Sequence, residues 1–161
     1  MTKFGILHCT GFMYIKAARQ RVITLIKTLV SKQKLELWYP VIKVEEHRVP
    51  LFPEYVFLQK PSVKLENKLK DIVFKDLRFL RNNRNRFCFL SKTAQMFISG
   101  IVKRDYSKEH IGQFGRLIGG VFKGFLGHKV DEFNDEVILN VFTFSDEVRI
   151  REKKGNIVFL K

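Results

Sequence analysis

The chain has 161 residues, 45% of them hydrophobic and 29% charged, which excludes a wholly disordered protein and fits one domain or two small ones. Its formal net charge of +14 at pH 7 indicates a polyanionic partner, either a nucleic acid or an anionic membrane surface. No apolar run approaches the roughly 20 residues of a membrane-spanning helix, and the first residues lack the apolar segment of a signal peptide, so we expect a cytoplasmic protein.

Positive charge is concentrated in the N-terminal part of the chain. Residues 1–97 contain 19 lysines and arginines against 7 acidic residues, whereas residues 111–161 contain 8 against 7. We therefore expect the first part to bind the polyanion, whereas the charge of the second part does not require it to bind one.

The first 97 residues alternate between strand and helix patterns. Residues 4–9 predict a strand, and residues 14–31 predict a helix with one apolar and one basic face. Two extended runs follow, over residues 35–46 and 48–60, and then a helix over residues 61–74 that Ser62 can cap. A hairpin over residues 77–91, turning at the letters NNRN, and a short helix from Ser91 complete this part. The order predicts a small α+β domain over residues 1–97, with an antiparallel sheet flanked by helices.

The remainder of the chain has a different character. Residues 98–110 are polar and lack periodicity, which predicts a linker. Residues 111–161 combine clustered glycines with short β-rich runs, and this spacing of strands and turns is typical of a small barrel or sandwich.

The sequence shows no catalytic constellation. It has no phosphate-binding loop and no nucleophile elbow, and its four histidines and two cysteines (Cys9 and Cys88) lack the spacing of metal ligands. We expect two reduced thiols in or near a core, no metal, no cofactor and no enzymatic activity.

A glycine motif in the C-terminal part resembles a known family. The letters GGVFKGFLGHKV are similar to the KOW motif of ribosomal and other RNA-binding proteins, which implies an SH3-like KOW barrel over residues 111–161. Glycines in such a motif serve tight bends. The matching residues are Gly120, Phe122, Gly124, Gly127 and Val130.

The stretch PLFPEYVFL, residues 50–58, resembles the signature of the NusG N-terminal domain, and in order and spacing the whole chain is similar to NusG/RfaH-type transcription elongation factors. The resemblance implies that Phe52, Tyr55 and Phe57 form an apolar patch that binds the clamp helices of RNA polymerase. Because side chains alternate along a strand, Val56 and Leu58 should then face the helix-covered core.

The resemblance further implies a monomer that contacts non-template single-stranded DNA in the transcription bubble, suppresses pausing and recruits a ribosomal protein or the termination factor Rho through the KOW domain. Charge alone selects the candidate DNA-binding residues, since arginine suits both phosphate and base contacts. An ordinary solvated surface is the alternative for each of them. The candidates are Lys16, Arg21, Arg78, Arg81, Arg84 and Arg86.

Three departures from the family pattern indicate a specialised paralogue. Phe4-Gly5 replaces a Trp-Tyr pair, Glu54 replaces a glycine, and the basic connection before Leu51 is shortened.

Other functions and another fold remain open. A ribosome-associated RNA-binding KOW protein is the main alternative, although the nearly neutral C-terminal part disfavours it, and a membrane-surface protein is a third. RfaH can also hold its C-terminal domain as a helical hairpin. The β-branched and aromatic residues 137–144 favour strands here, and we expect a loosely tethered barrel that leaves the docking patch free.

Overall fold

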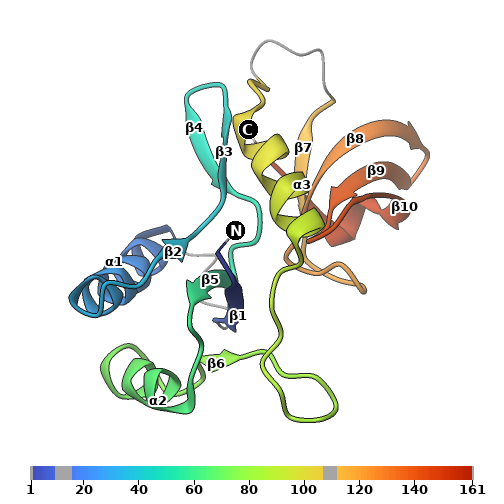
Figure 1. The fold of residues 1–161 in the computed structure, drawn as a ribbon. Coiled ribbons are helices and arrows are strands. Elements are labelled where there is room, and N and C mark those ends of the chain that lie inside the picture. Colours follow the sequence, from blue (N-terminus) through green and yellow to red (C-terminus); the bar gives the residue numbers. More distant parts are fainter. Residues whose placement is uncertain (1, 10–15, 107–111, 161) are drawn as a thin grey trace. The chain divides into compact units, whose positions relative to one another are not determined.

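The computed structural model describes residues 2–9, 16–106 and 112–160 (Figure 1). It divides into two compact units. The first unit comprises Met1–Tyr39 and Pro53–Lys92, and the second comprises Pro40–Phe52 and Thr93–Lys161. These units do not coincide with the predicted segments 1–97, 98–110 and 111–161, because residues 40–52 group with the C-terminal part of the chain.

The first unit is built on a four-stranded antiparallel sheet with strand order β2-β5-β1-β6. In register, Leu7 of β1 lies opposite Val56 of β5, and His8 lies opposite Tyr55. The strands are β1 (Phe4–His8), β2 (Leu37–Trp38), β5 (Tyr55–Gln59) and β6 (Arg78–Phe79). An antiparallel sheet was predicted for this region, and its presence is confirmed.

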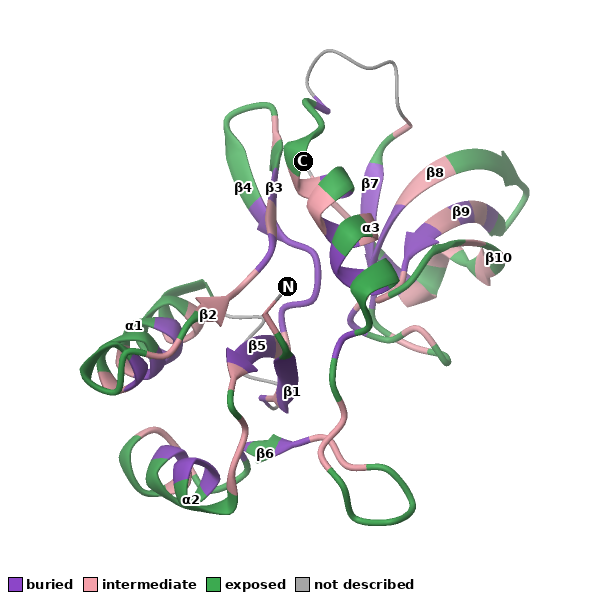
Figure 2. Ribbon diagram, in the orientation of Figure 1, coloured by how far each residue is buried: buried purple, intermediate pink, exposed green. Residues whose placement is uncertain are grey.

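Two helices contribute to the core of this unit: α1 (Lys16–Lys32) and α2 (Val63–Ile72). Their buried residues include Val22 and Ile26 of α1 and Leu69 of α2, as the apolar spacing predicts. Val56 and Leu58 lie in the same core cluster, so the predicted inward direction of these two side chains is confirmed. Figure 2 shows the buried residues along β1 and β5 and on part of each helix.

The N-terminus of α2 is capped as predicted. The hydroxyl oxygen of Ser62 accepts a hydrogen bond from the Leu65 N–H at 3.1 Å, which satisfies one of the free donors in the first turn.

The predicted linker is wrong over residues 98–103, because α3 (Lys92–Lys103) continues through them. Ala94, Ile98 and Ile101 recur at helical spacing and are buried. Gly100 lies on the exposed side of this helix. Part of the linker, residues 107–110, lies outside the described residues.

The second unit contains the hairpin β3 (Val41–Val44) and β4 (His47–Pro50), α3, and a five-stranded antiparallel sheet with order β10-β9-β8-β7-β11. Val137, Leu139 and Val141 of β9 are buried in its core, so the preference of residues 137–142 for a strand over a helix is confirmed. The strands are β7 (Phe114–Leu117), β8 (Leu126–Phe133), β9 (Glu136–Phe142), β10 (Glu147–Lys153) and β11 (Ile157–Phe159), with a short 3-10 helix, η2 (Lys154–Asn156).

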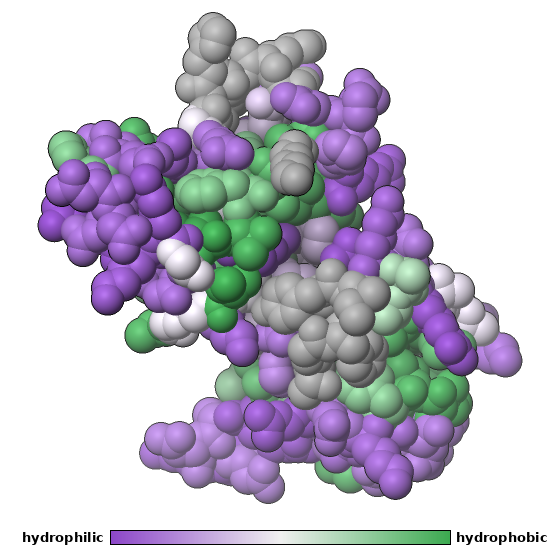
Figure 3. Space-filling model, turned by 180° about the vertical axis from the view of Figure 1, so that it is seen from behind, coloured by the Kyte–Doolittle hydropathy of each residue, from purple (hydrophilic) through white to green (hydrophobic). Residues whose placement is uncertain are grey.

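Within the described residues, no helix is both long and apolar enough to cross a membrane. Hydrophilic side chains predominate on the face seen in Figure 3, as the 29% of charged residues leads one to expect.

Candidate nucleic-acid interface

The predicted docking aromatics are less accessible than the sequence suggested. Phe57 lies on the sheet face opposite Val56 and Leu58, yet it is fully buried, with its ring centroid 5.7 Å from that of Trp38. Tyr55 is half-buried. The expectation of a free patch containing an exposed Phe57 is therefore wrong.

Phe52 is also fully buried, and it belongs to the second unit. Its ring packs edge-on against Phe125 at 5.4 Å and Phe144 at 4.8 Å between centroids, so it is a core aromatic of that unit. This packing could not be predicted from sequence patterns, because Phe52 lies more than 70 positions from Phe125 and Phe144.

One end of the first sheet carries a row of polar residues that are half-buried, apart from the exposed Arg78. His8 lies between Tyr55 and Arg78 in register, and its ring nitrogen Nε2 is 3.8 Å from the Glu54 carboxylate. Burial lowers the pKa of His8 below its usual 6.5; Glu54 opposes this shift and Arg78 adds to it. Burial likewise raises the pKa of Tyr55, and Glu54 adds to that shift.

Five of the six predicted DNA-binding cations are exposed, and they come from three places in the first unit. Lys16 and Arg21 lie on α1, and Arg78 lies on β6. Arg84 and Arg86 lie together on the loop of the 78–89 hairpin. Arg81 is the exception, since it is half-buried.

The loop of this hairpin is organised by Asn82. The Asn82 side-chain oxygen accepts hydrogen bonds from the N–H groups of Arg84 at 2.9 Å and Arg86 at 3.1 Å. Its backbone N–H donates to the Arg86 carbonyl, and its carbonyl accepts from the N–H of Asn85, which adopts a left-handed φ of 56° as asparagine readily does. The backbone bonds measure 2.9 Å each.

The same loop borders a shallow, open depression of about 360 Å³ lined by Asn82, Asn83, Arg84 and Arg86. The two guanidinium groups and two side-chain amides of these residues can donate hydrogen bonds to phosphate oxygens and to the edges of bases. This asparagine- and arginine-lined loop, residues 82–86, is the candidate nucleic-acid interface, and we call it the arginine loop.

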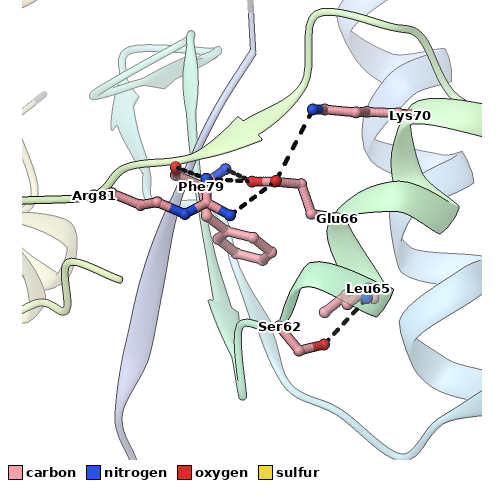
Figure 4. Close-up of polar contacts among 6 residues, drawn as sticks. All are labelled: Ser62, Leu65, Glu66, Lys70, Phe79 and Arg81. Carbon is pink, nitrogen blue, oxygen red and sulfur yellow. Dashed lines mark hydrogen bonds and ion pairs between the residues drawn. The ribbon is translucent and has the colours of Figure 1, made fainter. Parts of the chain in front are cut away.

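Arg81, at the base of the arginine loop, is held by Glu66 of α2 (Figure 4). Its Nη1 and Nη2 donate to the two carboxylate oxygens at 3.1 and 2.9 Å, and the Phe79 N–H donates to Oε2 at 2.6 Å. The Lys70 ammonium is 3.9 Å from Oε1. Although burial alone would raise it, the pKa of Glu66 is lowered, because these donors favour the carboxylate. Glu66 could not be identified from the sequence, since one acidic residue on an amphipathic helix is a common and unspecific feature.

The backbone of the C-terminal glycine motif adopts conformations that favour glycine at two of its positions. Gly120 and Gly124 have φ values of +75° and +90°, which side-chain-bearing residues rarely adopt. A Cβ at Gly127 would lie 3.0 Å from the Asn140 carbonyl oxygen. Phe122 packs against the core of this unit, whereas Val130 is 43% exposed.

Among the described residues, no three His, Cys, Asp or Glu side chains gather as the ligands of a metal ion would.

No protein-family model matches the sequence, and no curated protein matches it. Among solved structures, the chain is similar to that of Thermotoga maritima NusG, described for its domain interaction, with 16% identity and a TM-score of 0.45 over 100% of this chain and 98% of that chain. It is also similar to the MjSpt4:Spt5 complex in conformation A, with 13% identity and a TM-score of 0.32 over 98% of this chain and 97% of that chain. Conformation B of that complex gives 15% identity and a TM-score of 0.31 over 98% and 96%. Because these identities are low, the function of this chain has to be inferred from its own residues.

Proposed function

We propose that the chain is a NusG-type transcription elongation factor that acts by binding, without catalysis. It binds RNA polymerase and the non-template DNA strand through its N-terminal part and suppresses pausing. The observation that carries the proposal is the arginine loop, where exposed Arg84 and Arg86 border one shallow depression in the more basic part of the chain. The resemblance of residues 50–58 and of the glycine motif to the NusG and KOW signatures supports it.

DNA binding in this proposal uses phosphate contacts. Arg84 and Arg86 bind adjacent phosphates of a single strand, and Lys16, Arg21 and Arg78 add to the positive potential of the first unit. Such binding falls steeply with salt, with a slope of log K against log[salt] of about −0.7 per phosphate on single strands.

Polymerase binding in this proposal uses Tyr55 and Phe57. Because Phe57 is fully buried in this structure, docking through it requires a rearrangement that exposes its ring. The half-buried Tyr55 is the part of the patch that a partner can reach first. The KOW-like second unit then recruits a ribosomal protein or Rho.

A pull-down with the tagged full-length chain from its own cells tests the proposal. We expect RNA polymerase subunits, with the bound DNA recovered after crosslinking. Recovery of ribosomal RNA without polymerase would instead indicate the ribosome-associated alternative.

DNA binding is tested separately by fluorescence anisotropy with a labelled single strand. The double variant Arg84→Ala/Arg86→Ala should weaken binding by about 10-fold or more, the loss of two charged contacts. The matched control is Lys123→Ala/Lys153→Ala, which removes the same charge from exposed positions of the second unit. Equal losses in both double variants would contradict a site at the arginine loop.

A further inference from the structure

The carboxylate of Glu66 is buried, and three donors converge on it from the strand that leads into the arginine loop. Two come from the guanidinium of Arg81 and one from the backbone of Phe79 (Figure 4). The Glu66 side chain is 6% exposed and that of Arg81 is 24% exposed. A paired, forked contact of this kind fixes both position and orientation.

Arg81 is also fixed on the loop side. Its guanidinium carbon lies 4.7 Å from the centroid of the Phe87 ring, and Arg81 and Phe87 form the isolated bridge that closes the base of the loop. The Phe87 ring in turn packs edge-on against Phe79 at 5.7 Å. Glu66 therefore acts, through Arg81 and Phe79, on both strands from which the arginine loop projects.

This geometry separates Arg81 from the other arginines. If Arg81 turned towards a phosphate, it would leave the buried Glu66 carboxylate with fewer partners, which is costly. The contacts of Glu66 described above do not involve Arg84 or Arg86, and the backbone N–H groups of these two arginines donate to Asn82. Holding the backbone of both arginines in place reduces the conformational entropy that binding would otherwise cost.

We propose that Glu66 is a positioning residue, which holds the arginine loop in place for binding single-stranded nucleic acid. In this proposal Arg81 connects Glu66 to the loop and is not a phosphate ligand. The inference rests on the proposed function, because it assumes that Arg84 and Arg86 contact the nucleic acid. It runs against simple charge reasoning: removing an acidic residue should strengthen binding to a polyanion, whereas losing a positioning residue should weaken it.

The test uses the full-length chain, Glu66→Gln and a fluorescently labelled 20-nucleotide single strand. Glutamine keeps an acceptor for the Phe79 N–H but removes the charge that holds Arg81. We expect Glu66→Gln to bind about 3- to 10-fold more weakly although its net charge rises by one, with a shallower salt dependence. The matched control is Glu136→Gln, an exposed acidic position on β9, which should bind equally or more tightly.

A second measurement distinguishes positioning from a general loss of stability. Amide hydrogen exchange of Arg84 and Arg86 should accelerate about 10-fold in Glu66→Gln, while exchange in β8 and β9 stays unchanged. Should Glu66→Gln fail to fold, Glu66→Gln/Arg81→Gln removes both charges of the ion pair, so that no unpaired buried charge is left and the net charge is unchanged. The same measurements on it decide the question, since weaker binding with faster loop exchange again supports positioning.

Unchanged or tighter binding by Glu66→Gln, or loop exchange that does not change, overturns the inference. If Arg84→Ala/Arg86→Ala weakens binding while Glu66→Gln does not, the DNA site stands and only the positioning role is wrong. If neither variant differs from the control, the arginine loop is not the nucleic-acid site, and both proposals fail.

Discussion

The guanidinium of Arg116 donates a hydrogen bond to the carbonyl oxygen of Pro50, with Nη2 and the oxygen 2.6 Å apart. Its Nη1 donates to the carbonyls of Leu51 at 3.1 Å and Gly124 at 3.0 Å. Arg116 lies on β7 and is only 9% exposed. One buried cation thus holds the end of β4 and the connection from β7 to β8 within the second unit.

Replacing this cation should destabilise the second unit. Arg116→Ala leaves buried carbonyls without a charged donor, and we expect a loss of about 2–4 kcal/mol in the free energy of unfolding. Denaturant unfolding of the full-length chain measures it. The control Arg149→Ala, at an exposed position on β10, should stay within about 0.5 kcal/mol of the parent. A similar small effect for Arg116→Ala would show that its hydrogen bonds contribute little.

Phe57 should behave as a core residue. Phe57→Ala removes a fully buried ring, and we expect a loss of about 3–5 kcal/mol in the free energy of unfolding. The matched control is Phe89→Ala, because the Phe89 side chain is 47% exposed and should cost much less. Thermal unfolding followed by circular dichroism compares the two. If Phe57→Ala were as stable as the parent, the ring would have to be accessible in solution.

Much of the first unit could be predicted from local patterns. Strand alternation placed Val56 and Leu58 in the core, and the Ser62 cap follows from one residue type at the start of an apolar period. Alternation also places Phe57 on the opposite face, but it says nothing of whether that face is covered. The continuation of α3 to Lys103 was missed because residues 98–110, considered as one polar segment, lack periodicity.

The contacts that organise the candidate site could not be predicted. Glu66 and Arg81 are 15 positions apart, and Arg116 and Pro50 are 66 apart. Such pairs form because the fold brings a buried charge close to its hydrogen-bond partners. A contact between residues so far apart in the chain leaves no periodic pattern in the sequence. The six basic residues selected by charge were therefore treated as equivalent, whereas in the structure Arg81 forms an ion pair with Glu66.

Acid should destabilise the first unit through His8. Because burial lowers its folded-state pKa below the usual 6.5, the unfolded chain binds a proton more readily than the folded chain. The stabilising contribution is present above about pH 6.5 and is lost as the pH falls towards the lowered folded-state pKa.

Unfolding free energies at about pH 7.5 and pH 5.5 test this, a range that lies above the titration of most carboxylates. The parent should lose more stability across the range than His8→Gln, whereas His47→Gln, at an exposed position on β4, should follow the parent. An equal pH dependence of the parent and His8→Gln would exclude His8 as the titrating group.

Two glycines should respond to alanine in opposite directions. Gly100 lies exposed within α3, and a Cβ there would meet no atom within 4 Å, so Gly100→Ala should stabilise the chain by about 0.5–1 kcal/mol. Gly124 has a φ of +90°, so Gly124→Ala forces a side-chain-bearing residue into a strained conformation and should cost about 1–3 kcal/mol. Denaturant unfolding of both variants beside the parent measures the two shifts. Because neither substitution changes the net charge, single-stranded DNA binding by the folded variants should stay unchanged. Destabilisation by Gly100→Ala would show that residues 98–103 are not helical in solution.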